Sequence, residues 1–313
     1  MPEVVTLGES MAVLSPNRPG RLRNSQLLTL GVGGAETNVA VSLARLGVPS
    51  GWFSALGNDE LGDYVLSTIR GQGVDCSRVL RSDAPTGLYL RDTLAGGTVR
   101  AFYYRAGSAA SRLGAGDFDD SYLDGSKVLH VTGITLALSD SCRSLVHEAV
   151  AAARKRGVLV SLDVNLRLKL WGAEEARAAI EELLPQVDLV FVGDDEAQAL
   201  WHASDPTLLD RLARFGPSEV VMKRGAAGAQ ALHDGTFVES TGFRVPVVDT
   251  VGAGDAFAAG YLAARIWGLG IDERLRYGNA MGAYCVSSTG DFENAPSITE
   301  LKALLGERQD IGR

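Results

Sequence analysis

Short apolar runs typical of buried strands alternate with helix-like segments along most of the chain, and this alternation constrains the fold more than any other feature of the sequence. The predicted strands cover residues 4–8, 51–56, 128–131, 158–163, 189–192 and 220–223. The predicted helices cover residues 35–46, 60–70, 139–156, 173–184, 195–203 and 207–215. Repeated strand–helix units form a mostly parallel sheet covered by helices on both faces. The predicted fold class is therefore α/β, a three-layer α/β/α domain whose ligands bind beyond the carboxyl ends of the strands.

The pattern changes toward the C-terminus and in two earlier segments. Residues 229–233 and 236–240 flank Asp234-Gly235, a pair typical of a two-residue hairpin, and should add an antiparallel edge to the sheet. Three more helices are expected at 255–267, 272–286 and 298–305, and residues 244–248 are apolar enough to end a strand. Residues 12–30 and 86–104 form short alternating runs punctuated by glycine and proline, which predicts the strands of a small separate sheet. A chain of 313 residues, 46% of them hydrophobic, can bury a large core, and we expect a single domain over residues 1–313.

Charge and cysteine content narrow the partners and the compartment. A net charge of −8 argues against nucleic acid or an anionic membrane as the main partner. The three cysteines, Cys76, Cys142 and Cys285, form no C-x-x-C pair, so neither a disulfide framework nor a zinc site is expected. Glu3 and Glu9 interrupt the apolar N-terminal stretch, which does not fit a signal peptide, and no run approaches the roughly 18 apolar residues that span a bilayer. We therefore expect a cytoplasmic protein without a nucleic-acid or membrane partner.

One stretch carries the clearest chemistry: Asp249-Thr250-Val251-Gly252-Ala253-Gly254-Asp255-Ala256-Phe257. Its two glycines permit backbone torsions that other residues resist, and the unpaired N–H groups of the helix that follows can bind an anion. A carboxylate beside such an anion hole suits phosphoryl transfer to an alcohol, because the amides stabilise the moving phosphoryl group while the carboxylate deprotonates the attacking hydroxyl. The predicted catalytic residues are the base Asp255 and an anion hole formed by Gly252, Ala253 and Gly254. Taken alone, the glycine turn also fits a surface turn or a helix cap.

Two further motifs lie upstream: Gly33-Gly34-Ala35-Glu36-Thr37-Asn38-Val39-Ala40 and Gly57-Asn58-Asp59-Glu60-Leu61-Gly62. Together with the stretch at 249–257 they resemble the motifs of the PfkB (ribokinase-like) carbohydrate kinases, and the resemblance covers nearly the whole chain. It implies a ribokinase-like kinase domain that uses ATP and Mg²⁺, with a small β-sheet lid formed by residues 12–34 and 86–106. A dinucleotide-binding loop at residues 31–36 is disfavoured, because Glu36 stands where that fingerprint has its third glycine.

The nucleotide must be held in another way than in the commonest kinases, because the chain has neither a Walker A loop nor the protein-kinase motifs. The family resemblance implies that the phosphates contact Lys223, Gly225, Gly228, Gly252 and Gly254. It also implies that Asn279 lies near the adenine and that Glu196 acts on magnesium indirectly, through water. Gly193 departs from the asparagine that the family often has three residues before this glutamate. Structural alternatives are a solvated Lys-Arg turn, close helix packing, and an acidic first helical turn that favours the helix dipole.

Four residues near the predicted ligand edge suit a hydroxylated carboxylate: Tyr89, Tyr103, Arg105 and Arg167. Strand alternation puts Tyr103 and Arg105 on one face, and Arg167 closely follows the strand at 158–163. A guanidinium offers a planar fork to a carboxylate, whereas a neutral sugar has no need of paired guanidinium groups. Each arginine taken alone also fits a solvated surface charge.

Within the PfkB family, the motifs around these residues look like those of the 2-keto-3-deoxygluconate kinases. That resemblance implies a sugar-acid site lined by Gly34, Tyr89, Tyr103, Arg105, Arg167, Asp255 and Asp291, with Asn38 as a partner of the sugar hydroxyls. The four histidines have no metal-ligand spacing and are expected to be structural.

The predicted activity is transfer of the γ-phosphoryl group of ATP to the C6 hydroxyl of 2-keto-3-deoxygluconate by a homo-oligomeric kinase. Two alternatives stay open: a family kinase for a neutral sugar such as fructose or ribose, and a non-catalytic regulator that binds nucleotide or sugar. The sequence also leaves open the preferred C4 epimer and the binding of a monovalent cation such as K⁺ near Asp249.

Overall fold

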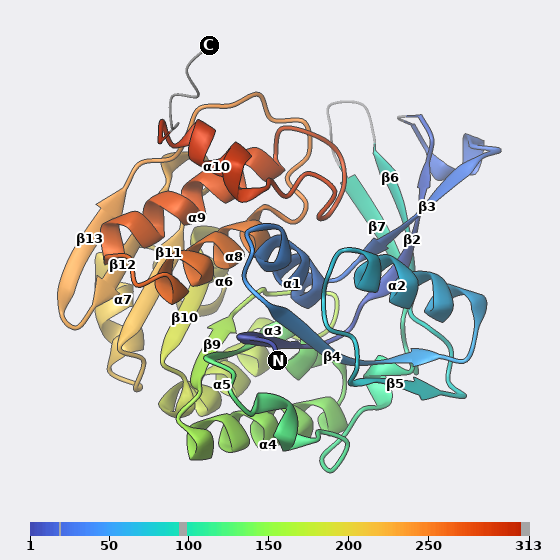
Figure 1. Ribbon diagram of the computed structural model, residues 1–313, viewed down its shortest axis with the longest axis horizontal. Coiled ribbons are helices and arrows are strands. Elements are labelled where there is room, and N and C mark those ends of the chain that lie inside the picture. Colours follow the sequence, from blue (N-terminus) through green and yellow to red (C-terminus); the bar gives the residue numbers. More distant parts are fainter. Residues whose placement is uncertain (19, 94–98, 308–313) are drawn as a thin grey trace.

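The computed structural model describes residues 1–18, 20–93 and 99–307, and within them a nine-stranded sheet forms the centre of the molecule (Figure 1). The strand order is β13-β12-β11-β10-β9-β8-β1-β4-β5. The strands are β1 (Val4–Leu7), β4 (Ser50–Gly57), β5 (Val79–Ser82), β8 (Val128–Thr132), β9 (Leu159–Asp163), β10 (Leu189–Gly193), β11 (Glu219–Lys223), β12 (Ala229–His233) and β13 (Thr236–Ser240). Neighbours pair in parallel except at β11–β12 and β12–β13. The predicted mostly parallel sheet with an antiparallel edge is therefore confirmed.

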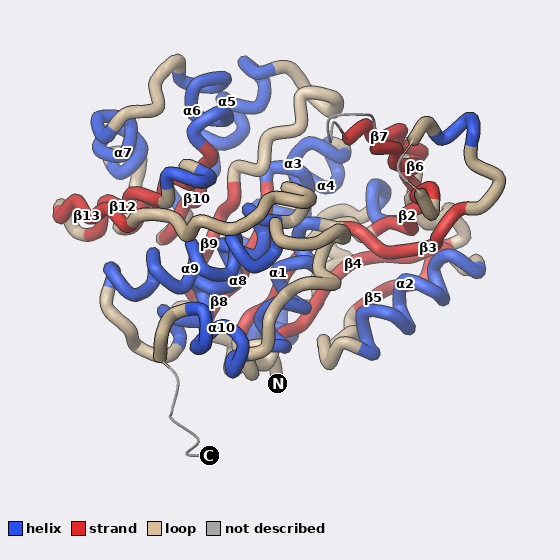
Figure 2. The backbone as a smooth tube through the Cα atoms, turned by 90° about the horizontal axis from the view of Figure 1, so that it is seen from above, coloured by secondary structure: helices blue, strands red, loops and turns tan. Residues whose placement is uncertain are grey.

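Helices cover both faces of this sheet, as Figure 2 shows. One face carries α1 (Ala35–Arg45), α8 (Ala253–Ile266), α9 (Ile271–Cys285) and α10 (Ile298–Leu304). The other carries α3 (Gly133–Leu138), α4 (Asp140–Arg156), α5 (Ala173–Leu183), α6 (Asp194–Trp201) and α7 (Pro206–Ala213). In β10, Leu189 and Phe191 join the apolar cluster of α8 and α9, while Val190 and Val192 join that of α4 and α5. Burial on both faces explains why such strands are apolar at successive positions.

A separate small sheet stands beside the central one, to the right in Figure 1, with the order β3-β2-β6-β7. Its strands are β2 (Met11–Pro16), β3 (Leu28–Gly33), β6 (Leu88–Thr93) and β7 (Val99–Tyr104), and α2 (Glu60–Gly71) packs near β2 and β4. The pairs β2–β3 and β6–β7 are antiparallel, whereas β2 and β6 run in parallel and join two distant segments of the chain. The small sheet predicted from residues 12–30 and 86–104 is present; residues 94–98 of the second segment lie outside the described residues.

The structure differs from the sequence predictions in one wrongly predicted strand end and in two elements that were not predicted. The prediction that residues 244–248 end a strand is wrong: they form a loop in which Val247 and Val248 are 64% and 55% exposed. Pro246 has no N–H to give to a ladder, and the amides of Val248 and Asp249 donate instead to the carbonyl of Val286 at the end of α9. Strand β5 and helix α3 were both missed by the sequence pattern, because each is short: four and six residues, respectively.

Short 3₁₀ turns complete the described structure at Leu22–Asn24, Ala110–Arg112, Asp120–Leu123, Leu184–Gln186 and Gly225–Ala227. Across the described ranges, none of the helices combines the length and the apolar character that crossing a bilayer requires.

Candidate active site

The predicted anion hole lies where the loop at residues 249–252 enters α8. Gly252 has φ 77°, and a Cβ at this position would stand 2.3 Å from the carbonyl oxygen of Asp291. Both the torsion and the close approach therefore require glycine. The amides of Gly254 and Asp255 have no hydrogen-bond acceptor among the described residues. These N–H groups at the start of a 14-residue helix can stabilise an anion, as the sequence predicts.

The carboxylate of Asp255 is buried beside these amides and held from two sides. Asn38 of α1 donates from Nδ2 to Oδ2 (2.8 Å), and Asn165, which follows β9, donates from Nδ2 to Oδ1 (3.2 Å). Burial raises the pKa of Asp255 to about 6, against the hydrogen bond from Asn38, which lowers it. The group is thus mostly ionised at neutral pH but close enough to neutrality to accept a proton.

The side chain of Asn38 also offers a hydrogen-bond acceptor to a ligand. Its Oδ1 atom is buried and has no hydrogen-bond partner in the described part of the chain. Because its amide nitrogen is engaged by Asp255, the free oxygen can accept a hydrogen bond from a ligand hydroxyl.

Lys223 lies at the end of β11 next to the anion hole. A Cβ on Gly254 would stand 3.2 Å from its Nζ atom, so a larger residue at this position would push the ammonium group away by a few tenths of an ångström. Nζ also forms an ion pair with Asp163 at the end of β9, at 2.6 and 2.9 Å from the two carboxylate oxygens. Desolvation lowers the pKa of Lys223, but the attraction of Asp163 and Glu196 outweighs it, and the pKa is raised. The lysine therefore stays charged, with part of its charge already balanced by protein.

Glu196 occupies the third position of α6, and both of its oxygens are engaged by backbone. Oε2 accepts from the amide of Gly193 (2.7 Å), and Oε1 accepts from the amide of Leu166 (2.7 Å). The carboxylate thus ties the loop after β9 to the start of α6. This is the helix-capping arrangement of the structural alternative.

The other predicted nucleotide residues gather at the neighbouring corner. Gly228 has φ 97°, and a Cβ there would stand 2.1 Å from the carbonyl of Ser240, whereas Gly225 is open. Asn279 of α9 donates from Nδ2 to the carbonyls of Ser240 (3.2 Å) and Thr241 (3.3 Å). The turn after β11, the end of β13 and α9 therefore meet at one place, on the side of Lys223 away from the small sheet.

On the small-sheet side, Tyr89 and Asp291 come together at Gly33. The hydroxyl of Tyr89 donates to Oδ2 of Asp291 (3.1 Å), and a Cβ on Gly33 would overlap both side chains, at 2.6 and 2.2 Å. Burial raises the pKa of Asp291 to about 7 and also raises that of Tyr89. Gly34 is the residue before α1, and a Cβ there would stand 2.7 Å from the carbonyl oxygen of Glu9. The glycine pair thus lets the small sheet lie close to the start of α1.

Tyr103, Arg105 and Arg167 line an open cavity of about 730 Å³ between β7, the loop after β9 and α6. The same cavity is bordered by Ala101, Ala106, Leu166, Leu168, Lys169, Leu170, Asp195, Glu196 and Ala199. The rings of Tyr103 and Tyr89 lie 5.4 Å apart. The predicted sugar-binding residues therefore form two adjoining groups, one at this cavity and one around Tyr89, Asp291 and Asp255.

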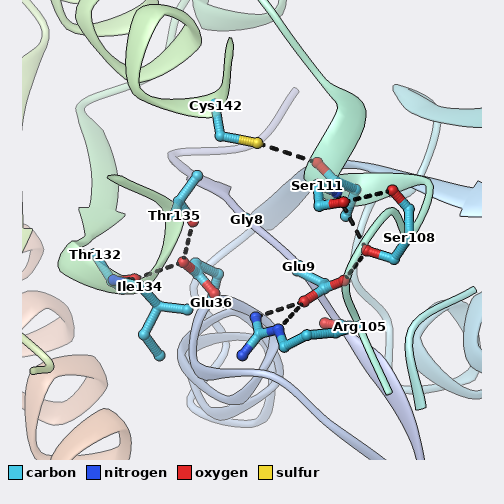
Figure 3. Close-up of polar contacts among 12 residues, drawn as sticks. Gly8, Glu9, Glu36, Arg105, Ser108, Ser111, Thr132, Ile134, Thr135 and Cys142 are labelled. Atoms are coloured by element: carbon cyan, nitrogen blue, oxygen red, sulfur yellow. Dashed lines mark hydrogen bonds and ion pairs between the residues drawn. The ribbon is translucent and has the colours of Figure 1, made fainter. Parts of the chain in front are cut away.

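The two arginines of the cavity differ in their partners. Arg105 is only 9% exposed, and its Nε and Nη2 atoms lie 2.6 and 2.5 Å from Oε2 of the fully buried Glu9 (Figure 3). Arg167 is exposed and hydrogen-bonds only the carbonyl of Leu166 (3.0 Å) among the described residues. Its positive charge is therefore the less compensated of the two.

Glu9 is a centre of contacts between the small sheet and the rest of the molecule. Besides Arg105, its carboxylate accepts a hydrogen bond from the hydroxyl of Ser108 (Figure 3). A Cβ on Gly87 would stand 2.7 Å from its Oε1 atom, and one on Gly34 would stand 2.7 Å from its backbone oxygen. All four chain connections to the small sheet therefore meet at this residue.

A second buried carboxylate, Glu36 of α1, lies nearby in Figure 3. Its Oε1 atom accepts hydrogen bonds from the hydroxyls of Thr132 and Thr135, each at 2.7 Å, and Gly8 leaves the space that its side chain fills. Burial raises the pKa of Glu36 to about 7. These contacts join α1 to β8 and α3 behind the site.

Three of these residues were not assigned a role from the sequence: Glu9, Arg91 and Asn165. Asn165 lies two residues after the end of the buried strand β9 and has φ 38°, a conformation that asparagine adopts more readily than most residues. Glu9 is an acidic residue two residues after the end of the apolar strand β1. A polar or acidic residue shortly after an apolar strand is a sequence signal from which a role for Asn165 and Glu9 could have been predicted. Arg91 pairs with Asp249 and shows no comparable local signal.

Free amides at the start of α8 with the buried Asp255 carboxylate beside them suit a phosphotransferase that acts on an alcohol. Residues 1–298 match the family described as pfkB family carbohydrate kinase, and the chain belongs to this family. It is similar to the 2-dehydro-3-deoxygluconokinase of Bacillus subtilis (strain 168), with 38% identity over 317 residues that cover 99% of this chain and 97% of the relative. It is also similar to the 2-dehydro-3-deoxygluconokinase of Thermoproteus tenax, with 36% identity over 97% of this chain and 94% of the relative.

A similar solved structure is that of a putative ribokinase II from E. coli in complex with ATP and Mg²⁺. It has a TM-score of 0.89 and 26% identity, and the match covers 98% of this chain and 100% of that one. The fold, including the small sheet, is therefore the ribokinase-like fold that the sequence predicts.

Proposed function

We propose that this carbohydrate kinase transfers the γ-phosphoryl group of ATP to the C6 hydroxyl of 2-keto-3-deoxygluconate, which gives the 6-phosphate and ADP. The observation that carries the proposal is the Asp255 carboxylate, held by Asn38 and Asn165 beside the free amides of Gly254 and Asp255. The named activity of the Bacillus subtilis and Thermoproteus tenax relatives supports the choice of sugar acid.

In this reaction Asp255 is the general base. The bond from O6 to the γ-phosphorus forms while the bond from that phosphorus to the β–γ bridging oxygen breaks, and the hydroxyl proton goes to Asp255. A pKa raised to about 6 keeps the carboxylate mostly ionised at neutral pH and gives it enough basicity to accept the proton. Asn38 and Asn165 hold its two oxygens in place, so that the acceptor hydroxyl meets an oriented carboxylate.

The free amides of Gly254 and Asp255 stabilise the charge on the transferred group, whereas the amide of Ala253 already donates to the carbonyl of Thr250; Lys223 adds a positive charge beside them. Mg²⁺ bound with ATP neutralises phosphate charge and orients the chain of phosphates. Within the described residues, no three His, Cys, Asp or Glu side chains gather as a metal-binding group. This fits an ion that keeps most of its waters and is held largely by the nucleotide, with Glu196 acting through water.

The sugar acid lies between Asp255 and the cavity. Arg167 supplies uncompensated positive charge for the carboxylate, while Arg105 is oriented by Glu9 and offers its remaining N–H groups. Tyr89, Tyr103, Asp291, Asn38 and Gly34 surround the hydroxyls and the sugar chain. Gly225, Gly228 and Asn279 border the nucleotide.

The small sheet acts as the lid of this site, formed by the two segments 12–34 and 86–106 of one domain. Closure excludes water from the γ-phosphate, which would otherwise be hydrolysed. The inner face of β7 supports this role, since Ala101 and Tyr103 border the cavity.

The protein is cytoplasmic and forms homo-oligomers. All three cysteines are buried and unpaired, which suits a reducing compartment. The outer face of the small sheet exposes the apolar side chains of Leu28, Phe102 and Tyr104, which suits a contact between copies of the chain. Size-exclusion chromatography with light scattering measures the assembly directly.

A substrate panel tests the proposed activity. ADP formation is measured with purified protein, ATP and Mg²⁺ against sugar acids of the gluconate and galactonate series and against matched neutral sugars. The sugar acid should be preferred by roughly 10- to 200-fold in kcat/KM, the range of one charge-assisted hydrogen bond. A preference for fructose or ribose would contradict the sugar-acid assignment. Nucleotide binding without turnover on any acceptor would indicate a regulator.

A further inference from the structure

A lid residue reaches the carboxylate that precedes the anion hole. Arg91, on β6 of the small sheet, forms an ion pair through Nη2 with Oδ2 of Asp249. Its Nη1 atom lies 3.7 Å from Oδ1 of Asp291. All three side chains are largely buried, with exposures of 11%, 3% and 7%. The guanidinium therefore stands between two buried carboxylates, and the sequence analysis assigned it no role.

Asp249, through its carboxylate, and Asp291, through its backbone, both contact the turn that forms the anion hole. Oδ1 of Asp249 accepts from the amide of Val251 (3.2 Å), and its Oδ2 atom is 3.5 Å from the amide of Gly290. The carbonyl of Asp291 lies against the α-carbon of Gly252. The side chain of Asp249 thus fixes the start of the turn, and the backbone of Asp291 packs against Gly252.

Electrostatics explain why a cation is needed at this place. Negative charge on Asp249, and on Asp291 in its ionised form, repels the phosphate charge that the turn is proposed to bind, and low exposure makes this repulsion poorly screened. A guanidinium is charged at every working pH and can bind two carboxylates at once. Arg91 therefore offsets this repulsion while it draws Asp249 and Asp291 toward one another.

A monovalent cation near Asp249, which the sequence leaves open, would need the same carboxylate oxygen that Arg91 occupies. The contacts of Asp249 leave no oxygen without a donor: Oδ1 binds Val251, and Oδ2 binds Arg91 and faces Gly290. The residues present do not fit an added K⁺ at this carboxylate, because the adjacent guanidinium of Arg91 already balances its charge and would repel a second cation.

We infer that Arg91 is a positioning residue that supplies the positive charge at Asp249 in fixed form, so that phosphoryl transfer needs no monovalent cation. The inference rests on the proposed phosphoryl transfer at this turn, and it does not depend on which sugar is the acceptor. Because Tyr89 lies two residues before Arg91 and contacts the same Asp291, this face of β6 also joins the small sheet to the anion hole.

The first experiment measures the cation dependence of the unaltered enzyme. Turnover is compared in K⁺, Na⁺ and tetramethylammonium salts at one ionic strength and at saturating Mg²⁺, with any acceptor that the enzyme phosphorylates. The three rates should agree within about twofold, since a fixed guanidinium replaces the ion. A loss of more than about tenfold without K⁺ would overturn the inference, because a needed charge would then come from solution.

The second experiment removes the guanidinium with Arg91→Ala and compares it with Arg91→Lys. The loss of a charge-assisted contact should lower kcat/KM by roughly 10- to 200-fold in the alanine variant and less in the lysine variant. Added guanidinium or K⁺ should restore part of the lost activity, which a merely structural defect would not allow. Arg100→Ala is the matched control: Arg100 pairs with Asp92 on the same hairpin and is 42% exposed, so activity should stay within about twofold of the parent.

Two results for the Arg91→Ala enzyme would contradict the inference. An Arg91→Ala enzyme with unchanged kcat/KM, or one whose lost activity neither guanidinium nor K⁺ restores, counts against the role at Asp249. Should this variant not fold, the cation dependence of the unaltered enzyme still decides. Because every comparison is a ratio on one acceptor, a wrong sugar assignment leaves the result readable.

Discussion

The anion-hole corner and the sugar-acid corner of this protein are built in different ways. Gly252, Gly254 and Asp255 lie within four consecutive residues, and the turn and helix start that present them are one local structure. Arg105 and Arg167 come from segments more than 60 residues apart, and the carboxylate that orients Arg105 lies 96 residues before it. The chemistry is thus encoded in one short stretch, whereas the specificity depends on tertiary contacts that no local pattern shows.

The two corners also differ in how charge is balanced. Asp255 is held by two neutral amide side chains, so burial raises its pKa and makes it a better proton acceptor. Arg105 is held by a buried carboxylate, which leaves little net charge at that position. Of the residues lining the cavity, Arg167 is the one from which we expect most of the selection for an anionic sugar.

The largest expected effect comes from removing the base. Asp255→Asn should keep the fold and nucleotide binding but lose about 10²–10⁴-fold in turnover, the usual contribution of a general base. Steady-state kinetics and nucleotide titration on the purified variant measure both. Retention of more than roughly a tenth of the parent turnover would mean that another group takes the proton.

Next in size is the loss of selection for the acid. Arg167→Leu should lower kcat/KM by roughly 10- to 200-fold with the sugar acid and change little with a poor neutral sugar. The comparison is a cycle of enzyme and substrate, which cancels general damage to the fold. Equal losses on both sugars would assign Arg167 to structure or to phosphate binding.

Arg105→Leu sharpens the contrast between the two arginines. It should also weaken the sugar acid selectively, toward the lower end of the range of roughly 10- to 200-fold, because Glu9 already balances part of the charge of Arg105. In addition it leaves Glu9 buried without its partner, which typically costs about 3–5 kcal/mol of folding free energy. Thermal or urea unfolding should therefore show a clear loss for Arg105→Leu and almost none for the exposed Arg167→Leu. Similar stability of the two variants would show that Glu9 does not depend on Arg105.

The pH profile separates the base from the arginines. Asp255 must be ionised to act, and its pKa is raised from 3.8 to about 6, so kcat/KM should fall as pH drops through about 6 and should be flat just above it. Below this value the decrease approaches about tenfold per pH unit. Arg167→Leu should lower the curve and also move this limb toward higher pH, because the positive charge of Arg167 helps to lower the pKa of Asp255. A limb near pH 4 would show that Asp255 is not shifted as its burial implies.

The smallest effect concerns the motion of the small sheet. Amide hydrogen exchange in β6 and β7 should slow when the sugar acid binds, because closure shields these strands from solvent. Helix α5, on the far side of the central sheet from α8, serves as an internal reference whose exchange should not change. Equal exchange with and without saturating substrate would speak against a closing lid.

The sequence predicts most of the central sheet because burial on both faces leaves a local mark, a continuous apolar run, in each strand. β5 has no such mark: it is a four-residue edge strand whose residues are half-buried or exposed. α3 consists of six residues and is largely buried, so no polar face marks it as a helix. Residues 244–248 are apolar but lie exposed in a loop, where the prediction used apolarity alone.

The same reason separates the predicted and the missed parts of the site. The anion hole could be located because glycine torsions and a helix start are properties of consecutive residues. The partners of Asp249 and Arg105 could not, since Arg91 is separated from Asp249 by 158 residues and Glu9 from Arg105 by 96. A single sequence shows which charged residues are present but does not show which of them form ion pairs in the folded protein.

The way the small sheet is attached limits how a protein like this can change its substrate. Two separate chain segments build that sheet, and all four of their connections return to the single residue Glu9. Recombination that exchanges one segment would break the β2–β6 pairing and leave a buried carboxylate facing a foreign neighbour. Single substitutions on the faces of β6 and β7, or at Arg167 in the loop after β9, leave this attachment intact and are the simpler route to a new specificity.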